Sequence, residues 1–346
     1  MFGRMMNNYY YGKSGKGDFR KEDMPKNRWE LFWDTLRTRL SALVRLNLMY
    51  MLIWLPAIIT IIYYSFGVIS EMTTILSARD GTLKTMMEER AGEENAVVYT
   101  DEQIAALAAI DPLERAEGGL FQMLLILFPC IAITGPFTAG ITYVTRNWAR
   151  DEHAFIWTDF KDAIKENWKQ SLVVSIITGA IPLLLYVGWR FYGQMAAKQP
   201  FMMVPQMLVL MIAIIWSISV TYLYPLIVSY DLKLKGLFRN ALLLGVARLP
   251  MSVGIRLLHC IPLLIGAVMA YFWNPFYSVM IIAGYYFLIG FGLSRFITAS
   301  YTNAVFDRFI NSRIEGAVTN RGLRQDSDDE EDGEKEFGEE TDPPEN

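Results

Sequence analysis

The sequence of 346 residues has little of the chemistry on which most metal sites and many enzymes depend. It contains two cysteines, Cys130 and Cys260, each inside an apolar stretch, and two histidines, His153 and His259. Neither cysteine has a partner at the spacing of a zinc motif or an exposed disulfide, so both are expected to be small buried hydrophobes. We expect His153 to be solvated, and His259 to be a hydrogen-bonded core residue or a ligand contact. The scarcity of cysteine and histidine predicts that the protein binds no metal and no cofactor.

Catalytic and nucleotide-binding motifs are missing as well. The stretch GKSGKG from Gly12 lacks the earlier glycine of a phosphate-binding loop, and the chain has no HExxH or GxSxG. The segment 231–250 lacks the acidic start of the loop with which ATP-binding-cassette permeases dock their ATPase. The sequence therefore predicts a protein that is not an enzyme and that has no nucleic-acid partner.

Asp and Glu are also absent from six long apolar blocks, and these blocks decide the fold class. A helix rises about 1.5 Å per residue, so some 20 apolar residues cross a hydrocarbon core of about 30 Å. The sequence thus predicts an all-α polytopic membrane protein with six spans. The absence of intramembrane carboxylates argues against a pump that uses buried acids, although a carbonyl-lined site stays open. The blocks are 46–69, 119–144, 171–192, 204–229, 251–273 and 275–300.

Lys and Arg are concentrated in every second connection. Ten lie in 1–45 and five in the connection between the second and third spans, whereas the turn between the last two spans has none. Because cytoplasmic loops carry the excess of basic residues, this pattern places both termini in the cytoplasm. It predicts a basic N-terminal segment (1–45) and a six-span domain (46–314) with an acidic external loop (70–118).

Two further segments are expected from local pattern. Within the external loop, Thr100 and Gln103 have the spacing of a capping box and predict a short helix. From Gln325 onward the chain holds twelve Asp and Glu against one Lys, and such like-charged runs do not collapse. We therefore expect 315–346 to be a disordered acidic cytoplasmic tail, either solubilising or binding.

Amphipathic segments lie between the spans. Trp157, Phe160, Ile164 and Trp168 recur at helical spacing, with charged residues on the remaining faces. This pattern is typical of a helix that lies in the membrane interface. The stretch 231–245 has a similar character, so a second such helix is expected there.

Two groups of residues inside the spans are candidate sites. Thr134, Gly135, Pro136 and Thr138 lie in the second span, where Pro136 removes a backbone donor and kinks the helix. The kink could open a polar cavity, as in broken transporter helices, or be a packing kink.

The second group consists of Arg256 and Arg295, each about 20 residues, or roughly 30 Å, from the turn at 273–276. That depth favours contact with lipid headgroups at the cytoplasmic interface over a separate anion site.

The stretches GPFTAGITYVTRNWARDE from Gly135 and DFKDAIKENWKQSLV from Asp159 resemble the YesL-like family of bacterial membrane proteins (domain of unknown function 624). DLKLKGLFRNALLL from Asp231 is also similar to that family, and the resemblance extends over roughly 28–310. It implies a multi-pass protein of the bacterial cell (inner) membrane, associated with carbohydrate uptake and without an established reaction. We therefore expect a non-catalytic accessory of a membrane assembly, in contact with the lipid bilayer and with a membrane protein such as a carbohydrate transporter. The alternative is a small-solute transporter or channel subunit.

Overall fold

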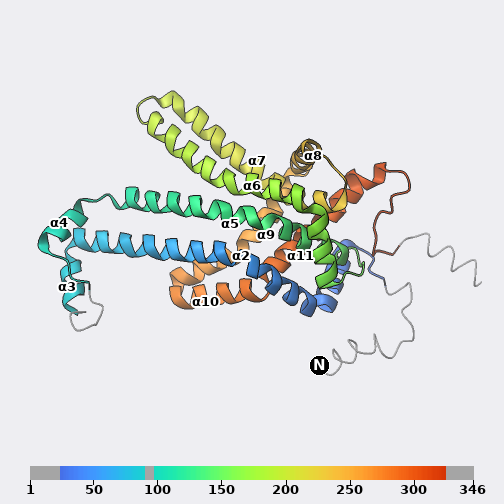
Figure 1. Ribbon diagram of the computed structural model, residues 1–346, viewed down its shortest axis with the longest axis horizontal. Coiled ribbons are helices and arrows are strands. Elements are labelled where there is room, and N and C mark those ends of the chain that lie inside the picture. The colour runs from blue at the N-terminus through green and yellow to red at the C-terminus, as the bar shows by residue number, and fades with distance from the viewer. Residues whose placement is uncertain (1–23, 90–96, 325–346) are drawn as a thin grey trace, which may run out of the picture. The chain divides into compact units, whose positions relative to one another are not determined.

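The computed structural model describes residues 24–89 and 97–324, and this part of the chain is built from helices (Figure 1). The N-terminal 23 residues and the acidic stretch from 325 onward, including most of the expected tail, lie outside it. The helices are α2 (Arg28–Asp80), α3 (Thr82–Glu89), α4 (Asp101–Ala109), α5 (Pro112–Trp148), α6 (Ile156–Ala196), η2 (Pro200–Met202), α7 (Met203–Ser229), α8 (Leu234–Ala247), α9 (Leu249–Phe272), α10 (Pro275–Tyr285), η3 (Tyr286–Gly290), α11 (Phe291–Phe309) and η4 (Asn311–Arg313).

Six of these helical segments are long and apolar enough to cross a membrane, which confirms the six-span all-α class. The fourth and fifth spans begin and end within two residues of the expected blocks. Between the last two spans, α9 ends at Phe272 and α10 begins at Pro275. The Ser278 hydroxyl donates to the Gly266 carbonyl across this pair, so the expected hairpin is confirmed.

Two spans are much longer than their apolar blocks. α2 has 53 residues and begins at Arg28, so it includes much of the basic N-terminal segment, and a kink at Arg39, where the backbone is not helical (φ −108°, ψ 15°), separates its first part from the first span. α6 has 41 residues, and the amphipathic segment from Trp157 to Trp168 is its first part rather than a separate helix. Neither segment contains glycine or proline to end the helix. By contrast, α8 is a separate helix close to the expected position, with Leu237, Ala241 and Leu244 buried.

The sixth span is not a single α-helix. The π-helix η3 interrupts it between α10 and α11, at Tyr286–Gly290. The apolar block 275–300 gave no indication of this interruption, because hydropathy does not report the hydrogen-bond register of the backbone.

The short helix expected between the first and second spans is confirmed. α4 begins after Thr100, whose side chain accepts from the Gln103 backbone N–H at 3.3 Å. The Gln103 side chain in turn accepts from the Thr100 N–H at 2.9 Å, which completes the capping box. The Arg79 side chain at the end of α2 donates to the carbonyls of Ala108 and Ile110, so α4 is held against α2.

The chain divides into two compact units. Of the described residues, unit 1 contains 24–51, 137–168 and 217–324, and unit 2 contains 52–89, 97–136 and 169–216. Unit 1 thus takes in one end of each of α2, α5, α6 and α7 together with α8 to α11. Unit 2 takes in the other parts of those four helices together with α3 and α4.

Two expectations need correction. Residues 315–324, assigned above to the disordered tail, are placed against the rest of unit 1: Arg321 pairs with Glu152, and the Arg324 N–H donates to the Pro25 carbonyl at 3.1 Å. This stretch carries Arg321 and Arg324 and a single acid, and the acidic run begins only after it. Cys260 is exposed on α9 rather than buried, while Cys130 is partly buried.

Candidate functional site

The Gly135–Pro136 kink in α5 is closed by a serine from α6. Pro136 has no N–H, so the carbonyl of Ala132, four residues earlier, loses its helical donor. The Ser175 hydroxyl donates to this carbonyl. Ser175 is 1% exposed, so the bond replaces the missing one inside the protein. At this point of unit 2 the carbonyl that Pro136 leaves without a helical donor is therefore bonded to the neighbouring helix.

Gly135 is required by the same contact. A Cβ at this position would overlap both the Ser175 hydroxyl and the backbone oxygen of Ser171. Ser171 is fully buried, so α5 and α6 approach each other here without a side chain between them. A second close approach occurs in unit 2, where a Cβ on Gly179 of α6 would lie 3.0 Å from the Phe128 carbonyl.

The threonines near the kink are buried and bonded. The Thr134 hydroxyl donates to the Ile131 carbonyl at 2.8 Å, and the Thr142 hydroxyl donates to the Thr138 carbonyl at 2.6 Å. Thr138 lies 2.6 Å from the hydroxyl of Tyr50 on α2, within unit 1. Each of the three threonines is 2% exposed. These bonds of Thr134 and Thr142 thus lie within α5, whereas the contact of Thr138 with Tyr50 joins α5 to α2.

Asn47 of α2 binds the π-helix of the sixth span. Its side-chain amide donates to the carbonyls of Tyr286 and Phe287 at 3.1 and 2.7 Å, and its oxygen accepts from the Gly292 N–H at 2.8 Å. A π-helix shifts the backbone register and leaves groups without their usual partners. Asn47 is fully buried and supplies three of those partners. It therefore fixes the register change in the sixth span.

Gly292 allows this approach. A Cβ at position 292 would lie 3.2 Å from the Asn47 Cβ and 3.2 Å from the Leu43 carbonyl. The ring of Tyr50, one turn further along α2, meets Phe291 edge-on with centroids 6.2 Å apart. One face of α2 thus holds both α5, through Tyr50, and the π-helix region, through Asn47.

A second polar cluster joins three other helices of unit 1. The Tyr222 hydroxyl on α7 lies 2.6 Å from the Ser252 hydroxyl on α9 and 2.9 Å from the Tyr301 hydroxyl on α11. Tyr222 and Ser252 are fully buried. Asn303, further along α11, donates to the Arg146 carbonyl on α5 at 3.2 Å. These bonds link α7 to α9 and α11, and α11 to α5.

The residues expected on an interfacial helix face in different directions. Phe160 is 5% exposed and packs where a Cβ on Gly140 of α5 would lie 2.8 Å from its ring. Ile164 touches the same position of α5, whereas Trp157 and Trp168 are exposed. The apolar stripe is therefore split, with Phe160 and Ile164 forming the α5–α6 contact and the two tryptophans remaining at the surface.

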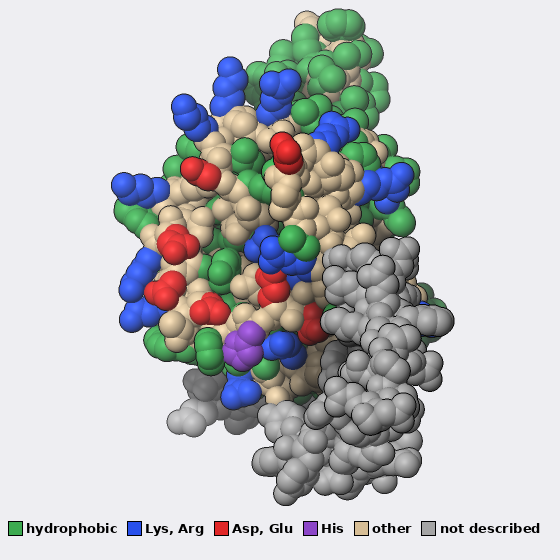
Figure 2. Space-filling view, turned by 90° about the vertical axis from the view of Figure 1, so that its right-hand side faces the viewer, with side chains coloured by type: hydrophobic (Ala, Val, Ile, Leu, Met, Phe, Trp, Pro, Cys, Tyr) green, Lys and Arg blue, Asp and Glu red, His purple; other side chains and the backbone are tan. Residues whose placement is uncertain are grey.

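Charged groups gather on unit 1. Figure 2 looks onto a face where Lys and Arg side chains are interspersed with Asp and Glu. Arg28 at the start of α2 pairs with Asp307 of α11, and Asp307 also accepts from the Asn311 amide at 2.6 Å. Nearby, burial raises the pKa of the Tyr230 hydroxyl to about 12, and this hydroxyl donates to Asn311 at 2.7 Å. The ends of α2, α7 and α11 are joined by these contacts.

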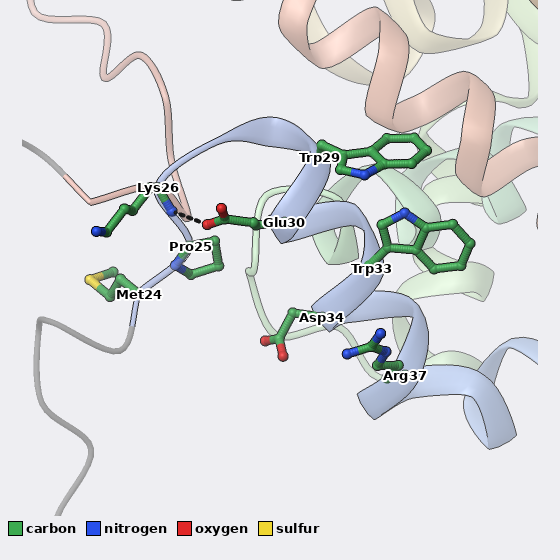
Figure 3. Close-up of a pocket in the computed structure, with 8 residues that line it drawn as sticks. All are labelled: Met24, Pro25, Lys26, Trp29, Glu30, Trp33, Asp34 and Arg37. Carbon is green, nitrogen blue, oxygen red and sulfur yellow. Dashed lines mark hydrogen bonds between the residues drawn. The ribbon is translucent and has the colours of Figure 1, made fainter.

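An open hollow of about 580 Å³ lies at the start of α2 (Figure 3). Trp29 and Trp33 project to one side of the helix, with ring centroids 5.5 Å apart, while Glu30 and Asp34 point to the other. Trp29 is 67% and Trp33 40% exposed. The Glu30 carboxylate accepts from the Lys26 N–H at 2.9 Å and fixes the first turn. The hollow combines exposed indoles with charges of both signs.

The two arginines expected to contact lipid headgroups lie on neighbouring helices, Arg256 on α9 and Arg295 on α11. Between them, the His259 Nε2 donates to the Ser294 carbonyl at 3.0 Å, so His259 is hydrogen-bonded as expected. His153 is exposed and meets Phe155 edge-on, with ring centroids 4.5 Å apart. Within residues 24–89 and 97–324, no group of three His, Cys, Asp or Glu side chains is arranged to hold a metal.

Asn47, Ser175 and Tyr222 were not singled out from the sequence. A lone asparagine in an apolar span is visible in the sequence, since a buried amide needs partners, and it could have been noted. Ser175 and Tyr222 carry no comparable indication, because serine and tyrosine are common in spans and their partners come from other helices.

Comparisons with known proteins find similarity in the segment that contains the kink. Residues 119–189 match the family described as "Protein of unknown function, DUF624", which confirms the resemblance to that family over a shorter stretch than expected. Over 143 residues the chain is 24% identical to "Uncharacterized protein YesV" of Bacillus subtilis (strain 168). The aligned region covers 41% of this chain and 67% of the relative. No solved structure matches. The matched segment contains both partners of the kink, Gly135–Pro136 and Ser175.

Proposed function

From the premise that this is a multi-pass membrane chain with a DUF624 segment, we propose that it is a non-catalytic partner of a membrane assembly. The observation that carries the proposal is the use made of the polar side chains inside the protein. Asn47, Thr138 and Ser175 are each bonded to a neighbouring helix. Groups used in this way hold a scaffold together and leave no reactive pair or open cavity at these positions.

The hollow at the start of α2 is where a partner would bind. Protein interfaces are enriched in tryptophan and arginine, and Trp29, Trp33 and Arg37 line this hollow. An aromatic pair beside charges of both signs suits a protein segment of mixed character, such as a loop of another membrane protein. The family resemblance favours a carbohydrate transporter as that protein.

Affinity purification from native membranes tests this proposal. The wild-type chain is expected to bring down a stoichiometric partner, and a variant with Trp29→Ala and Trp33→Ala is expected to lose at least 90% of it. The control is Trp157→Ala, which removes an exposed tryptophan from α6 and should leave recovery unchanged. Recovery of the chain alone from mild detergent, with the wild-type tryptophans intact, would contradict the proposal.

The orientation belongs to the same proposal. We propose a bacterial cell membrane with the basic connections on the cytoplasmic side, because Lys and Arg alternate from one connection to the next. Reporter fusions after Gly81, between α2 and α3, and after Glu166 in α6 should give opposite signals. Equal signals would place both positions on one side and contradict the topology.

A small-solute transporter or channel is the second candidate. The observation in its favour is the π-helix of the sixth span, since π-helices often occur at functional sites. Five further helices contain proline, which weakens regular backbone bonding and suits helices that bend. Purified protein in vesicles should then carry sugars, oligosaccharides or anions, and the absence of any flux would exclude this candidate.

A further inference from the structure

Two arginines lie on adjacent helices of unit 1 without an acidic partner. Arg256 precedes His259 by one turn on α9 and Arg295 follows Ser294 on α11, and the His259 Nε2 donates to the Ser294 carbonyl at 3.0 Å, so the two arginines lie at the same level of this helix pair. In the described part of the chain neither forms an ion pair with a carboxylate, and the Nε of Arg256 is buried with no hydrogen-bond partner. Buried charges are normally paired, because an isolated one loses its solvation. The described part of the protein therefore supplies no counter-charge to this pair of arginines.

The surrounding helices position this part of α9 and α11. The Arg295 guanidinium lies 5.8 Å from the ring centroid of Tyr224 on α7, at cation–π distance. His259, one turn after Arg256, is bonded to the carbonyl of Ser294, the residue before Arg295. The α9–α11 bond thus keeps the two arginines on facing helix segments, and Tyr224 positions the guanidinium of Arg295, an arrangement that suits an anion site.

The chemistry of the ligand follows from the flanking surface. Leu257, Leu258 and Ile261 on α9 are 60%, 42% and 44% exposed beside the arginines. Both arginines are about 20 residues from the turn at 273–276, or roughly 30 Å along their helices, which is the thickness of a hydrocarbon core. An anion at this depth with apolar surface next to it fits a phosphate group that carries acyl chains. Arginine binds phosphate through two parallel hydrogen bonds, which lysine cannot do.

We infer that Arg256 and Arg295 form a binding site for the phosphate of an anionic phospholipid, with its acyl chains along the exposed leucines of α9. The inference is independent of the proposed function, because it needs neither a partner protein nor transport. It assigns a specific ligand to two residues that would otherwise be simple interfacial arginines.

Native mass spectrometry and thermal unfolding in detergent test the site. Phosphatidylglycerol or cardiolipin should bind the wild-type chain and raise its melting temperature, whereas phosphatidylcholine with the same acyl chains should not. Arg256→Gln and Arg295→Gln should each weaken binding on the order of tenfold, because each removes a charge-assisted pair of bonds. The matched control is Arg239→Gln, which removes an exposed charge from α8 and should leave binding unchanged.

A further variant and a further ligand distinguish a phospholipid site from a general anion site and from a loss of folding. Arg256→Lys keeps the charge and should bind with intermediate affinity, so a well-folded variant remains available if Arg256→Gln fails to fold. Inorganic phosphate at millimolar concentration should protect far less than the lipid, since it lacks acyl chains. Three results would overturn the inference: equal protection by inorganic phosphate, equal protection by phosphatidylcholine, or equal loss of lipid binding in Arg239→Gln.

Discussion

Unit 1 and unit 2 hold their helices together in different ways. In unit 1, side chains such as Asn47 and Tyr222 reach across to the backbone or hydroxyls of other helices. In unit 2 the helices of the kinked segment meet at glycines, and Ser175 makes the bond between them. Unit 2 contains fewer buried polar residues than unit 1. Those of unit 2 are Thr60, Ser77, Thr134, Ser171 and Ser175.

Both units depend on their surroundings. Large apolar side chains are exposed in each, for example Ile59, Leu184 and Leu208 in unit 2 and Leu257 in unit 1, and only lipid or another protein can cover them. Hydrophobic association is weak between helices in lipid, so close packing at small residues must hold such a unit together. Unit 1 also has the larger share of the buried polar side chains, several of which bond to neighbouring helices. Substitutions in each unit can test this comparison.

Asn47→Leu should have the largest effect. It removes three hydrogen bonds to the sixth span and leaves the Gly292 N–H without a partner, a loss of about 3 kcal/mol at about 1 kcal/mol per bond. The apparent melting temperature in detergent should fall by several degrees. Asn240→Ala in α8, where no comparable set of bonds forms, is the control. An unchanged Asn47→Leu protein would mean that the π-helix does not need this amide.

Gly135→Ala should be the most damaging small change in unit 2. Its Cβ would overlap the Ser171 backbone oxygen, so α5 and α6 must move apart, at a cost of about 1 to 3 kcal/mol. Gly118→Ala in the same helix is the matched control, because nothing lies within 4 Å of its Cβ position. Alanine favours a helix over glycine by up to about 1 kcal/mol, so this variant should be equal to wild type or more stable. Equal behaviour of both variants would show that the helices are not in contact at Gly135.

Ser175→Ala should cost less, about 1 to 2 kcal/mol, because one buried carbonyl is left without a donor. Thr73→Ala provides the contrast. Its hydroxyl also donates to a carbonyl, that of Ile69, but it is exposed, and the change should stay within about 0.5 kcal/mol. If thermal unfolding gave the same loss for both, the bond across the proline kink would have no special role.

Asp151→Asn should have the smallest effect and should depend on pH. Partial burial raises the pKa of the Asp151 carboxyl above its usual 3.8, although Arg39 opposes this. An acid with a raised folded-state pKa binds more protons when folded, so stability falls as the pH rises from 3.8 through the folded-state value. The variant should therefore match wild type near pH 3 and exceed it slightly at neutral pH.

Asparagine tolerates the left-handed backbone at this position, where φ is 56°, so Asp151→Asn introduces no strain. Asp231→Asn, an exposed acid before α8, is the control in the same series of melting curves. A gain that is equally large at pH 3 would have to come from a source other than ionisation.

Much of the fold was accessible from the sequence, and much of its internal bonding was not. Apolar blocks and proline positions gave the six spans, because they depend on local composition. The capping box of Thr100 and Gln103 was found because both partners lie within four residues. The length of α2 was missed because hydropathy marks where lipid begins and a helix can continue well beyond it.

The candidate site was predicted in part. Gly135 and Pro136 were identified, and both a cavity and a packing kink remained open. The bond to the Ala132 carbonyl comes from Ser175, which lies 40 residues after Gly135 and is brought to the kink only by the α5–α6 pairing. The partners of Asn47 are still more remote, in the sixth span. Contacts between distant segments cannot be obtained from the spacing of one sequence.

The π-helix at Tyr286–Gly290 also changes how the sixth span should be drawn on a helical wheel. One additional residue in a turn rotates everything after it by about 100°, the angle per residue of a 3.6-residue turn. Residues of α10 and α11 that share a face on an uninterrupted wheel therefore point in different directions. When scanning mutagenesis, spin labels or designed crosslinks are interpreted along this span, the residues before and after Gly290 should therefore be plotted on two separate helical wheels.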